Sequence, residues 1–506
     1  MEAKEFVAKI IEKGFLPSPD LSTIVKEADT EQFLEFISQT YKEDKPLFIN
    51  NEVYDKFLGT TISTITETQV DIQPHEGKTV VTKPTERHRE QIDSKVKIKK
   101  NYIPINKKID INDWMTYYFD RYNRLRDILQ TRDELNGAIA IGRAIKMDNR
   151  QKVALIGIVK DIHKTLSGSY FLELEDPTGL IKVSLKSPTC AKKAEEIVFD
   201  EVLGLTGTKS GDIIYAEDII FPEIPERPVK KSEDEVYALF ISDIHVGSNM
   251  FLPKEFAHFI DWVNGYEGTE KQKEIAKKVK YIFITGDIVD GIGVYPGQEN
   301  ELVIKDIYKQ YEEFSKYIAQ IPEDIQIIIC PGNHDAVRIE EPQPALFKDI
   351  ASSLYMLKNV HMVSNPALIN IHNIGDFPGI DVLMYHGYSF DYYISEVPML
   401  RKYGYENIDL IHQFLLRKRH LAPSHGSTLI NPMAQDFLLI DKLPDVIVTG
   451  HVHKAKIGKY KNILTISSSC FQDRTPFQEK VGHHPEPGRV PILNLKTNEL
   501  KMLRFK

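Results

Sequence analysis

The stretch VYALFISDIH at residues 236–245 decides the fold of the carboxyl-terminal half of this 506-residue chain. An apolar run of strand-forming residues ends in Asp243 and His245, so we expect a buried strand that leads into a polar cluster. The same order recurs in YIFITGDIVD (281–290), IQIIICPGNHD (325–335), DVLMYHG (381–387) and VIVTGHVH (446–453). Because open α/β folds bind ligands at the carboxyl ends of their strands, we expect the five clusters to meet at one edge of a sheet.

The residues that end these strands are Asp, Asn and His, which supply oxygen and imidazole ligands for divalent ions such as Mn²⁺, Fe²⁺ and Zn²⁺. One Asp-x-His or His-x-His pair is weak evidence, because isolated histidines mostly have structural roles, but five clusters together are strong evidence. Glycines beside Asp287, Asn333, His386 and His451 permit tight turns and close approach of the backbone to a bound group. Two ions about 3.5 to 4 Å apart hold a phosphate and generate a hydroxide for in-line attack. The sequence therefore predicts a two-metal site for a phosphate ester.

Three regions precede this half of the chain. Residues 1–70 carry apolar residues at helical spacing and predict a small helical module, and the polar residues 71–110 predict a linker. The lysines of residues 95–100 favour a solvated stretch, with an arm that contacts DNA or docks a partner as the alternative. Residues 111–225 combine an amphipathic helix with about five short strands, which suits a β-barrel of the OB type. A proline-rich boundary separates this domain from residues 236–506.

The expected barrel has two possible uses. An OB barrel holds single strands of nucleic acid by stacking and charge, or it packs against a partner. No row of exposed aromatic residues is visible in the sequence, and this favours packing.

Composition and charge exclude several classes of protein. The chain is 42% hydrophobic and 27% charged, as globular proteins are, and no apolar run is long enough to span a membrane. The amino terminus has no secretory signal pattern, so we expect a cytoplasmic protein without a membrane partner. The net charge of −9 means that any contact with DNA requires a local basic surface. Cys190, Cys330 and Cys470 are too far apart in sequence for a disulfide framework, and we expect them to be reduced and buried.

The motifs Asp-x-His, Gly-Asp-x-x-Asp, Gly-Asn-His-Asp, His-Gly and Gly-His-x-His, in this order, resemble those of the calcineurin-like metallophosphoesterase superfamily. This resemblance implies an α/β domain built as a two-sheet sandwich. With the barrel and the helical module upstream, the chain is similar to the small subunits of archaeal D-family DNA polymerases, although only loosely over its first 110 residues. That family implies a large catalytic polymerase subunit as partner, a sliding clamp within the holoenzyme, and single-stranded or mismatched 3′ ends of DNA as substrate.

The resemblance also implies a role for each strand-end residue. One ion is held by Asp243, His245, Asp287 and His453. The other ion is held by Asp287, Asn333, His386 and His451, so that Asp287 bridges the two ions. His334 faces an oxygen of the scissile phosphate, Asp335 orients or polarises His334, and Asp290 supports the ligands from outside. No position of this set is missing here, whereas the related accessory subunits of eukaryotic replicative polymerases have generally lost these ligands.

Other polar residues carry weaker signals. Seven histidines lack the strand-end glycine and are expected to have structural or exposed roles: His361, His372, His412, His420, His425, His483 and His484. The basic cluster at residues 417–420 is expected to be a solvated face, with a contact to the DNA backbone as the alternative. Arg474, beside Asp473, is a candidate contact for a substrate phosphate.

Two hypotheses follow. In the first, the chain is a 3′-to-5′ exonuclease that proofreads for a replicative DNA polymerase, with two divalent ions, Mn²⁺ by resemblance, and a metal-bound hydroxide as nucleophile. In the second, the chain is a structural accessory subunit that scaffolds the polymerase chain and has little nuclease activity. The same two-ion chemistry also serves protein phosphatases and cyclic-nucleotide phosphodiesterases, but the upstream barrel favours nucleic acid. No polymerase active site is visible, so we expect synthesis to reside in the partner.

Overall fold

The computed structural model describes residues 9–13, 15, 30–40, 69–72, 93–166, 168–480 and 482–505. The chain divides into two compact units, formed by residues 1–66 with 458–460 and by residues 67–457 with 461–506. In the first unit, helix α3 (Thr30–Thr40) carries the buried side chains of Phe33 and Ile37. Most of the helical module expected over residues 1–70 lies outside the described residues, as do residues 73–92 of the expected linker, so these assignments stay predictions.

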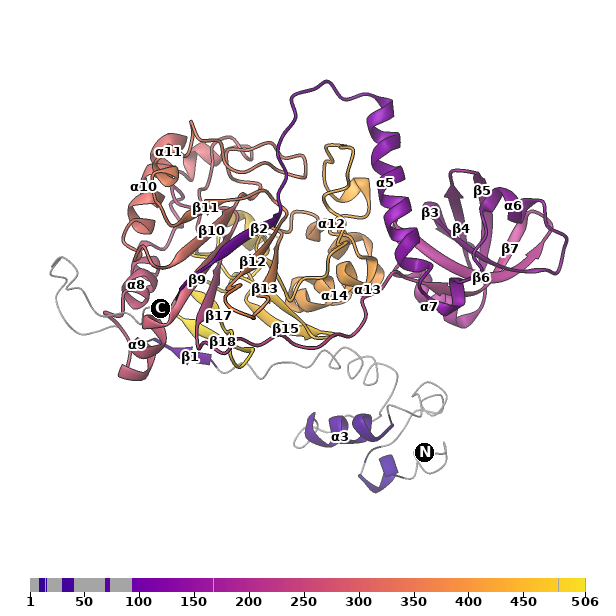
Figure 1. The fold of residues 1–506 in the computed structure, drawn as a ribbon, viewed down its shortest axis with the longest axis horizontal. Coiled ribbons are helices and arrows are strands. Elements are labelled where there is room, and N and C mark those ends of the chain that lie inside the picture. Colours follow the sequence, from indigo (N-terminus) through magenta and orange to yellow (C-terminus); the bar gives the residue numbers. More distant parts are fainter. Residues whose placement is uncertain are drawn as a thin grey trace. The chain divides into compact units, whose positions relative to one another are not determined.

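The first of two sheets in the carboxyl-terminal half has seven strands in the order β1-β18-β17-β8-β9-β10-β11 (Figure 1). Its strands are β1 (Gln69–Asp71), β8 (Tyr237–Ile241), β9 (Val279–Thr285), β10 (Gln326–Cys330), β11 (Val360–Met362), β17 (Arg489–Asn494) and β18 (Glu499–Arg504). Strands β8 to β11 are parallel, and β17 runs antiparallel to β8. Strand β9 is buried along its whole length, as expected for a parallel strand that is covered on both faces.

The second sheet has six strands in the order β15-β16-β14-β13-β12-β2. Its strands are β2 (Val96–Lys100), β12 (Ala367–Ile371), β13 (Ile380–Met384), β14 (Val446–Thr449), β15 (Lys456–Tyr460) and β16 (Ile463–Ser467). Strands β13, β14 and β16 are parallel, whereas β12 is antiparallel to both β13 and β2. The expected α/β domain with two mixed sheets is therefore confirmed.

Helices α8 (Pro253–Val263), α9 (Glu270–Lys277) and α10 (Ile307–Ile318) contribute to one hydrophobic core with the seven-stranded sheet. Phe256 of α8 and Phe314 of α10 are fully buried in it, and each such side chain contributes about 1.5–3 kcal/mol through burial. The other helices of this half are α11 (Ser352–Tyr355), α12 (Phe390–Glu396), α13 (Pro398–Arg401), α14 (Ile408–Lys418) and α15 (Pro476–Lys480). Short 3-10 turns are η2 (Asp133–Leu135), η3 (Gln298–Asn300), η4 (Gly404–Asn407) and η5 (His425–Ser427).

The prediction of a solvated linker is wrong for Val96–Lys100, because these residues form strand β2 and pair with β12 at the edge of the six-stranded sheet. Lys99 forms an ion pair with Asp381 at 2.6 Å, and Lys100 Nζ donates to the carbonyl of Leu439 at 2.8 Å. The central residues of the strand are exposed, which explains its polar sequence. Lysines on an edge strand prevent pairing with other sheets, so the charge that resembles a linker is also typical of a protected edge.

Residues 152–220 form a closed barrel of five strands in the order β3-β4-β5-β7-β6. The strands are β3 (Lys152–Lys164), β4 (Tyr170–Asp176), β5 (Gly179–Leu185), β6 (Val202–Ser210) and β7 (Ile213–Ile220). Helices α6 (Ile141–Ile145) and α7 (Pro188–Ala194) accompany it, and the long helix α5 (Ile111–Leu129) precedes it. Asp110 and Asp113 form a capping box at the start of α5, where the sequence predicts the amphipathic helix.

Strand β6 lacks a regular apolar alternation, because Gly204 and Gly207 interrupt it. A Cβ atom at Gly207 would lie 2.4 Å from the carbonyl oxygen of Tyr215, and one at Gly204 would lie 2.3 Å from the side chain of Leu135. Glycine therefore permits close approach of neighbouring chain segments at both positions.

A buried arginine ties α5 to the barrel and to the carboxyl-terminal domain. Arg121 is 0% exposed, and its Nε donates to Asp436 Oδ2 at 2.8 Å. Its Nη1 donates to the carbonyl oxygens of Asp200, which precedes β6, and of Pro423, which follows α14. Burial raises the pKa of Asp436, but His420 and Arg121 outweigh burial and hold this pKa far below its ordinary value. Arg121 is thus a charged anchor between three parts of the chain.

The basic cluster at residues 417–420 is mostly buried, so the expectation of a solvated face is wrong, and so is the alternative of a DNA contact. Lys418 Nζ lies 2.7 Å from Glu201 Oε2, and both side chains are 1% exposed. Arg419 donates to the carbonyl of Ile440, and His420 Nε2 lies 2.7 Å from Asp436 Oδ2. The acceptors come from segments distant in sequence, and for this reason the charge run itself does not reveal them.

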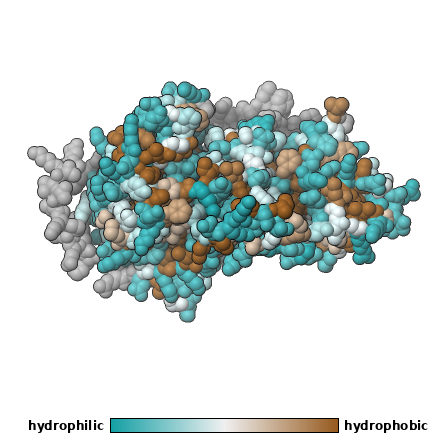
Figure 2. All heavy atoms as spheres, turned by 90° about the horizontal axis from the view of Figure 1, so that it is seen from above, coloured by the Kyte–Doolittle hydropathy of each residue, from teal (hydrophilic) through white to brown (hydrophobic). Residues whose placement is uncertain are grey.

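Large apolar side chains are exposed in the segment that leads into α5 and on one stripe of α5. Ile103, Ile105 and Ile111 are 73%, 61% and 71% exposed, and Met115 and Phe119 continue the line along the helix. On the face drawn in Figure 2, hydrophobic residues appear as patches within a largely hydrophilic surface.

The helices in the part of the chain that the structure describes include none long and apolar enough to cross a membrane. The three cysteines are free and buried, as expected.

Substitution of Arg121 by Met is expected to lower the free energy of unfolding by about 3–5 kcal/mol, because Asp436 would remain buried without its charged partner. Urea denaturation followed by circular dichroism measures this loss. Arg126→Met is the matched control on the same helix, since Arg126 pairs with Asp127 at the surface, where an ion pair contributes about 0–1 kcal/mol. Equal stability of the two variants would contradict the anchoring role of Arg121.

Candidate metal centre

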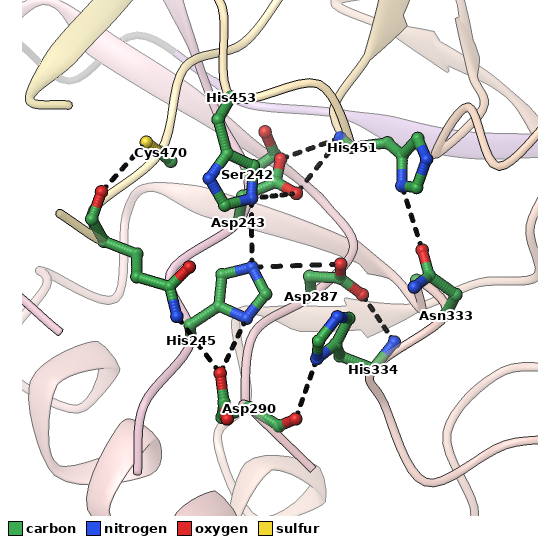
Figure 3. A network of polar contacts seen from close by, with 12 residues as sticks. Ser242, Asp243, His245, Asp287, Asp290, Asn333, His334, His451, His453 and Cys470 are labelled. Carbon is green, nitrogen blue, oxygen red and sulfur yellow. Dashed lines mark hydrogen bonds and ion pairs between the residues drawn. The ribbon is translucent and has the colours of Figure 1, made fainter. Parts of the chain in front are cut away.

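Three overlapping groups of potential ligand atoms lie at the carboxyl ends of β8, β9, β10, β13 and β14 (Figure 3). The ligand atoms of each group all lie within 4.8 Å of one another. The groups are Asp243 with His245 and His453, His245 with Asp287 and His334, and Asp287 with His386 and His451. The structure therefore brings the five predicted strand-end clusters to one place.

Asp287 lies in the middle of this centre and belongs to two of the groups. Its Oδ2 lies 3.2 Å from Nε2 of His386 and 3.9 Å from Nε2 of His245, and its Oδ1 accepts the backbone N–H of His334 at 2.8 Å. Burial raises the pKa of the Asp287 carboxyl, but His386 and His334 outweigh burial and lower this pKa well below its ordinary value. Likewise, burial lowers the pKa of His386, yet Asp287 outweighs it and raises the pKa to about 10. Asp287 thus favours a positive charge at Nε2 of His386, whether a proton or a metal ion.

His245 connects Asp287 to a second cluster of ligands. Its Nδ1 lies 3.1 Å from Asp290 Oδ1, so this nitrogen donates a proton to the carboxylate and leaves the Nε2 lone pair free. Nε2 of His245 lies 3.2 Å from Nε2 of His453, which in turn lies 3.5 Å from Asp243 Oδ1. Figure 3 shows these side chains turned toward one another.

The potential ligand atoms around Asn333 fit a metal cation. Asn333 Oδ1 lies 2.9 Å from Nε2 of His386 and 3.1 Å from Nδ1 of His451. His386 donates its other ring N–H to the carbonyl of Thr285, and His451 donates its other ring N–H to Asp391 Oδ2. Nδ1 of His451 and the amide oxygen of Asn333 thus offer lone pairs, and Nε2 of His386 offers one once a metal ion replaces its proton. A divalent ion held by these three atoms would satisfy all of them at once.

Backbone strain is concentrated on the potential ligands. Five of them have left-handed backbone conformations, with φ between 50° and 69°: Asp243, His245, Asp287, His451 and His453. Residues with a Cβ rarely adopt this region, and each instance costs on the order of 1–3 kcal/mol. The surrounding strands hold these residues in place, because Asp243 N–H donates to the Gly286 carbonyl and His245 N–H donates to the Asp287 carbonyl. The fold thus maintains an arrangement that the local sequence disfavours.

The glycines expected to permit close approach do so at three of the strand ends. A Cβ atom at Gly332 would lie 2.2 Å from Asp287 Oδ1, and one at Gly450 would lie 2.6 Å from Asp243 Oδ2. Gly286 combines a φ of 84° with a Cβ position 2.4 Å from Nδ1 of His386. A side chain at any of these positions would displace a ligand.

His334 and Asp290 lie against each other. Nδ1 of His334 donates to the main-chain carbonyl of Asp290 at 2.9 Å, and the rings of His334 and His245 pack edge to face. Asp335 does not contact His334 through its carboxylate. Its Oδ1 accepts the Tyr311 hydroxyl and its Oδ2 accepts the Gly332 N–H, so Asp335 supports the loop. Burial, followed by the charge of Asp287, raises the pKa of Asp335 to about 7.

Sequence reasoning missed several supporting residues. Asp391 lies in α12 and accepts the Nε2–H of His451 at 3.0 Å and the Tyr405 hydroxyl at 2.6 Å. Gln298 and Gln472 each donate an amide hydrogen to the Asp290 carboxylate. None of these residues belongs to a metal-binding motif, and only their spatial position reveals them.

The seven histidines expected to be structural or exposed lie outside the three ligand groups. His372 lies within hydrogen-bond distance of the Tyr281 hydroxyl and Asp234, and His412 of the Thr449 hydroxyl. Arg474 Nε donates to the carbonyl of His483 at 2.8 Å, and a contact of this guanidinium with a substrate phosphate stays a prediction.

The family model of calcineurin-like phosphoesterases matches residues 237–455 of this chain. These residues contain all five strand-end clusters of the candidate metal centre. The expected metallophosphoesterase domain is thus confirmed.

Several curated proteins are similar over most of the chain, and they are all named DNA polymerase II small subunit. The protein of Methanothermobacter thermautotrophicus is 42% identical over 399 residues, which cover 78% of this chain and 80% of the relative. That of Archaeoglobus fulgidus is 39% identical over 397 residues, covering 78% of each chain. That of Methanocaldococcus jannaschii is 40% identical over 390 residues, covering 76% of this chain and 64% of the relative. At this identity and coverage, the chain belongs to the family of small subunits of archaeal DNA polymerase II, the D-family polymerase.

Proposed function

We propose that this chain is a metal-dependent 3′-to-5′ exodeoxyribonuclease that proofreads within a heteromeric DNA polymerase. The observation that carries the proposal is the complete ligand set, in which side-chain atoms of Asn333, His386 and His451 converge beside the Asp287 carboxylate. A phosphoesterase family model over these residues supports hydrolysis of a phosphate ester. The direction of cleavage and the choice of DNA come from the resemblance to the polymerase small subunits.

The residues present fit two divalent ions, and Mn²⁺ is the ion that we propose. One ion would be held by Asp243, His245, Asp287 and His453. The other would be held by Asp287, Asn333, His386 and His451. When bound, such ions neutralise the phosphate charge and activate water for in-line attack.

His334 is the residue proposed to contact the scissile phosphate. Because its Nδ1 donates to the Asp290 carbonyl, its Nε2 is left to exchange a proton with, or bond to, a phosphate oxygen. Its backbone N–H is held by Asp287, which fixes the ring relative to the ligands. Asp335 acts on the same loop through the Gly332 N–H and keeps the turn that presents Asn333 and His334.

We further propose that the chain assembles with a large catalytic polymerase subunit and, through that holoenzyme, with a sliding clamp. The relatives are named small subunits, which supports a larger partner. The exposed apolar side chains of Ile103, Ile105 and Ile111 support an interface, because contiguous exposed apolar surface commonly marks one. We assign the barrel to the OB type, on its closure of five strands through a single parallel pair, β5 with β7.

A scaffolding subunit with little nuclease activity is the second candidate. The exposed apolar residues before and along α5 favour it, since they suit assembly and have no part in the metal centre. One chain can both scaffold a polymerase and hydrolyse DNA, and assays of DNA degradation show whether hydrolysis is present.

Incubation of 5′-labelled single-stranded DNA with the purified chain and Mn²⁺ is expected to give a ladder that shortens from the 3′ end. Asp287→Ala is expected to abolish the ladder and to lower bound Mn²⁺, because it removes a carboxylate shared by two ligand groups. His361→Ala is the matched control, since His361 contacts Gln326 outside the centre. Shortening from the 5′ end would refute the proposed direction. Cleavage only after addition of the large subunit would mean that the partner completes the site, and bound metal without cleavage in either case would favour the scaffold.

His334→Ala is expected to retain both metal ions but to slow cleavage by about 10²–10⁴, the range for loss of a proton-transfer residue. Single-turnover kinetics measures the rate, and elemental analysis of the purified variant measures the metal. Loss of metal in this variant would instead make His334 a ligand, a role that its place in the His245 and Asp287 group allows.

Asp391→Ala is expected to weaken Mn²⁺ binding or the cleavage rate by about 10- to 100-fold, because His451 would lose the acceptor that orients its ring. Calorimetric titration with Mn²⁺ measures the affinity. Asp376→Ala, which changes an exposed carboxylate, is the control and is expected to behave like the parental chain. Unchanged metal affinity and rate for Asp391→Ala would exclude this supporting role.

A further inference from the structure

An aromatic row crosses one face of the barrel. His163 of β3 pairs in register with Phe171 of β4, Phe171 with Ser184 of β5, and Ser184 with Tyr215 of β7. The rings of His163 and Phe171 are stacked, with centroids 6.1 Å apart and planes inclined by 19°. The four residues, which we call the barrel row, therefore form one line across four neighbouring strands, β3, β4, β5 and β7 (Figure 1).

The barrel row lies on the outer face of the barrel. Val183 and Leu185, on either side of Ser184, belong to the barrel core, so the alternation of a β-strand directs Ser184 outward. Tyr215 is 42% exposed, and the side chain of His163 is 58% exposed. Aromatic rings that face solvent on a barrel of this kind are suited to stacking with the bases of a nucleic acid.

Ser184 is the small member of the barrel row, between the larger Phe171 and Tyr215. The residue is 1% exposed, and its hydroxyl has no hydrogen-bond partner in the part of the chain that the structure describes. A buried hydroxyl without a partner costs about 1–3 kcal/mol. Because this hydroxyl is buried, a ligand on the outer face does not reach it, and only the aromatic members of the barrel row are available for contact.

The charges around the barrel row suit an anionic ligand. The neighbouring acids each lie close to a basic group: Asp161 to His163, Glu173 to Lys182, and Glu217 to Lys152. Lys186 follows β5 on the outward face, and its Nζ lies 5.9 Å from the centroid of the Tyr215 ring. Among the described residues, no carboxylate forms an ion pair with Lys186. One ammonium group is thus available to a phosphate beside the barrel row.

We propose that the barrel row binds single-stranded DNA, with bases stacked on Phe171 and Tyr215 and a phosphate at Lys186. Every base has a flat aromatic face, so this binding does not depend on sequence. A duplex keeps its bases stacked on each other, and the barrel row therefore selects single strands. This inference extends the proposed function, from which it takes the choice of DNA, but it requires no metal and no cleavage.

The test is the fluorescence anisotropy of labelled oligo(dT) titrated with the full chain in EDTA, at several salt concentrations. Phe171→Ala and Tyr215→Ala are each expected to weaken binding by about 5- to 100-fold, the loss of one stacked base. Phe171→Tyr keeps a ring and is expected to restore binding. Lys186→Gln is expected to reduce the slope of log affinity against log salt by about 0.7, the contribution of one phosphate contact. Leu180→Ala is the matched control, since Leu180 is an exposed apolar residue of β5 outside the barrel row.

His361→Ala, which changes a residue outside both the metal centre and the barrel row, is expected to bind oligo(dT) like the parental chain. Because the titration in EDTA involves neither metal nor cleavage, an error about cleavage and an error about the barrel row give different results. Oligo(dT) affinity within twofold of the parental value for both alanine variants of the barrel row would overturn the proposal. Unchanged affinity for oligo(dT) with lost association to a purified large polymerase subunit would also overturn it, and would make the barrel row a protein-docking surface. Equal affinity for duplex and single-stranded DNA would reject the stacking mode.

Discussion

The buried carboxylate of Asp287 is the interaction on which the carboxyl-terminal half depends. A buried charge is costly unless partners surround it, and here the partners come from both sheets. His334 follows a strand of the seven-stranded sheet, whereas His386 follows a strand of the six-stranded sheet, and both contact Asp287. Gly332 leaves the space that the carboxylate fills. Contacts that compensate the negative charge of Asp287 therefore join the two sheets at the edge that carries the candidate metal centre.

Buried charge also determines how the barrel joins the carboxyl-terminal domain. Arg121 and Lys418 are both buried, and each binds an acidic group and contacts a segment far away in sequence. Such ion pairs contribute less to stability than their number suggests, because desolvation opposes the attraction. Their contribution is geometric, since a guanidinium with several fixed acceptors permits few orientations of the helix that carries it. The barrel thus has a defined attachment to the domain that carries the metal centre.

The aromatic residues of the barrel form a row that becomes visible only when neighbouring strands are aligned by their register. His163, Phe171 and Tyr215 are separated along the chain, and a search for a run of aromatic residues does not find them. Strand register places them in one line, with Lys186 beside Tyr215. Because its aromatic residues are dispersed along the chain, the sequence favours a barrel that packs against a partner. The strand register instead supports a barrel that binds single-stranded DNA.

The sequence by itself determined the α/β class, the order of the strand-end ligands and the family, because an apolar strand followed by a glycine-flanked ligand is a local pattern. Only the tertiary structure decided which side chains touch. It placed Asp290 rather than Asp335 against His334, added Asp391 behind His451, and turned Val96–Lys100 into an edge strand. Likewise it buried the basic residues 417–420 against acids distant in sequence. Motif spacing records local geometry, whereas the partner of a side chain depends on contacts between distant segments, which no local pattern contains.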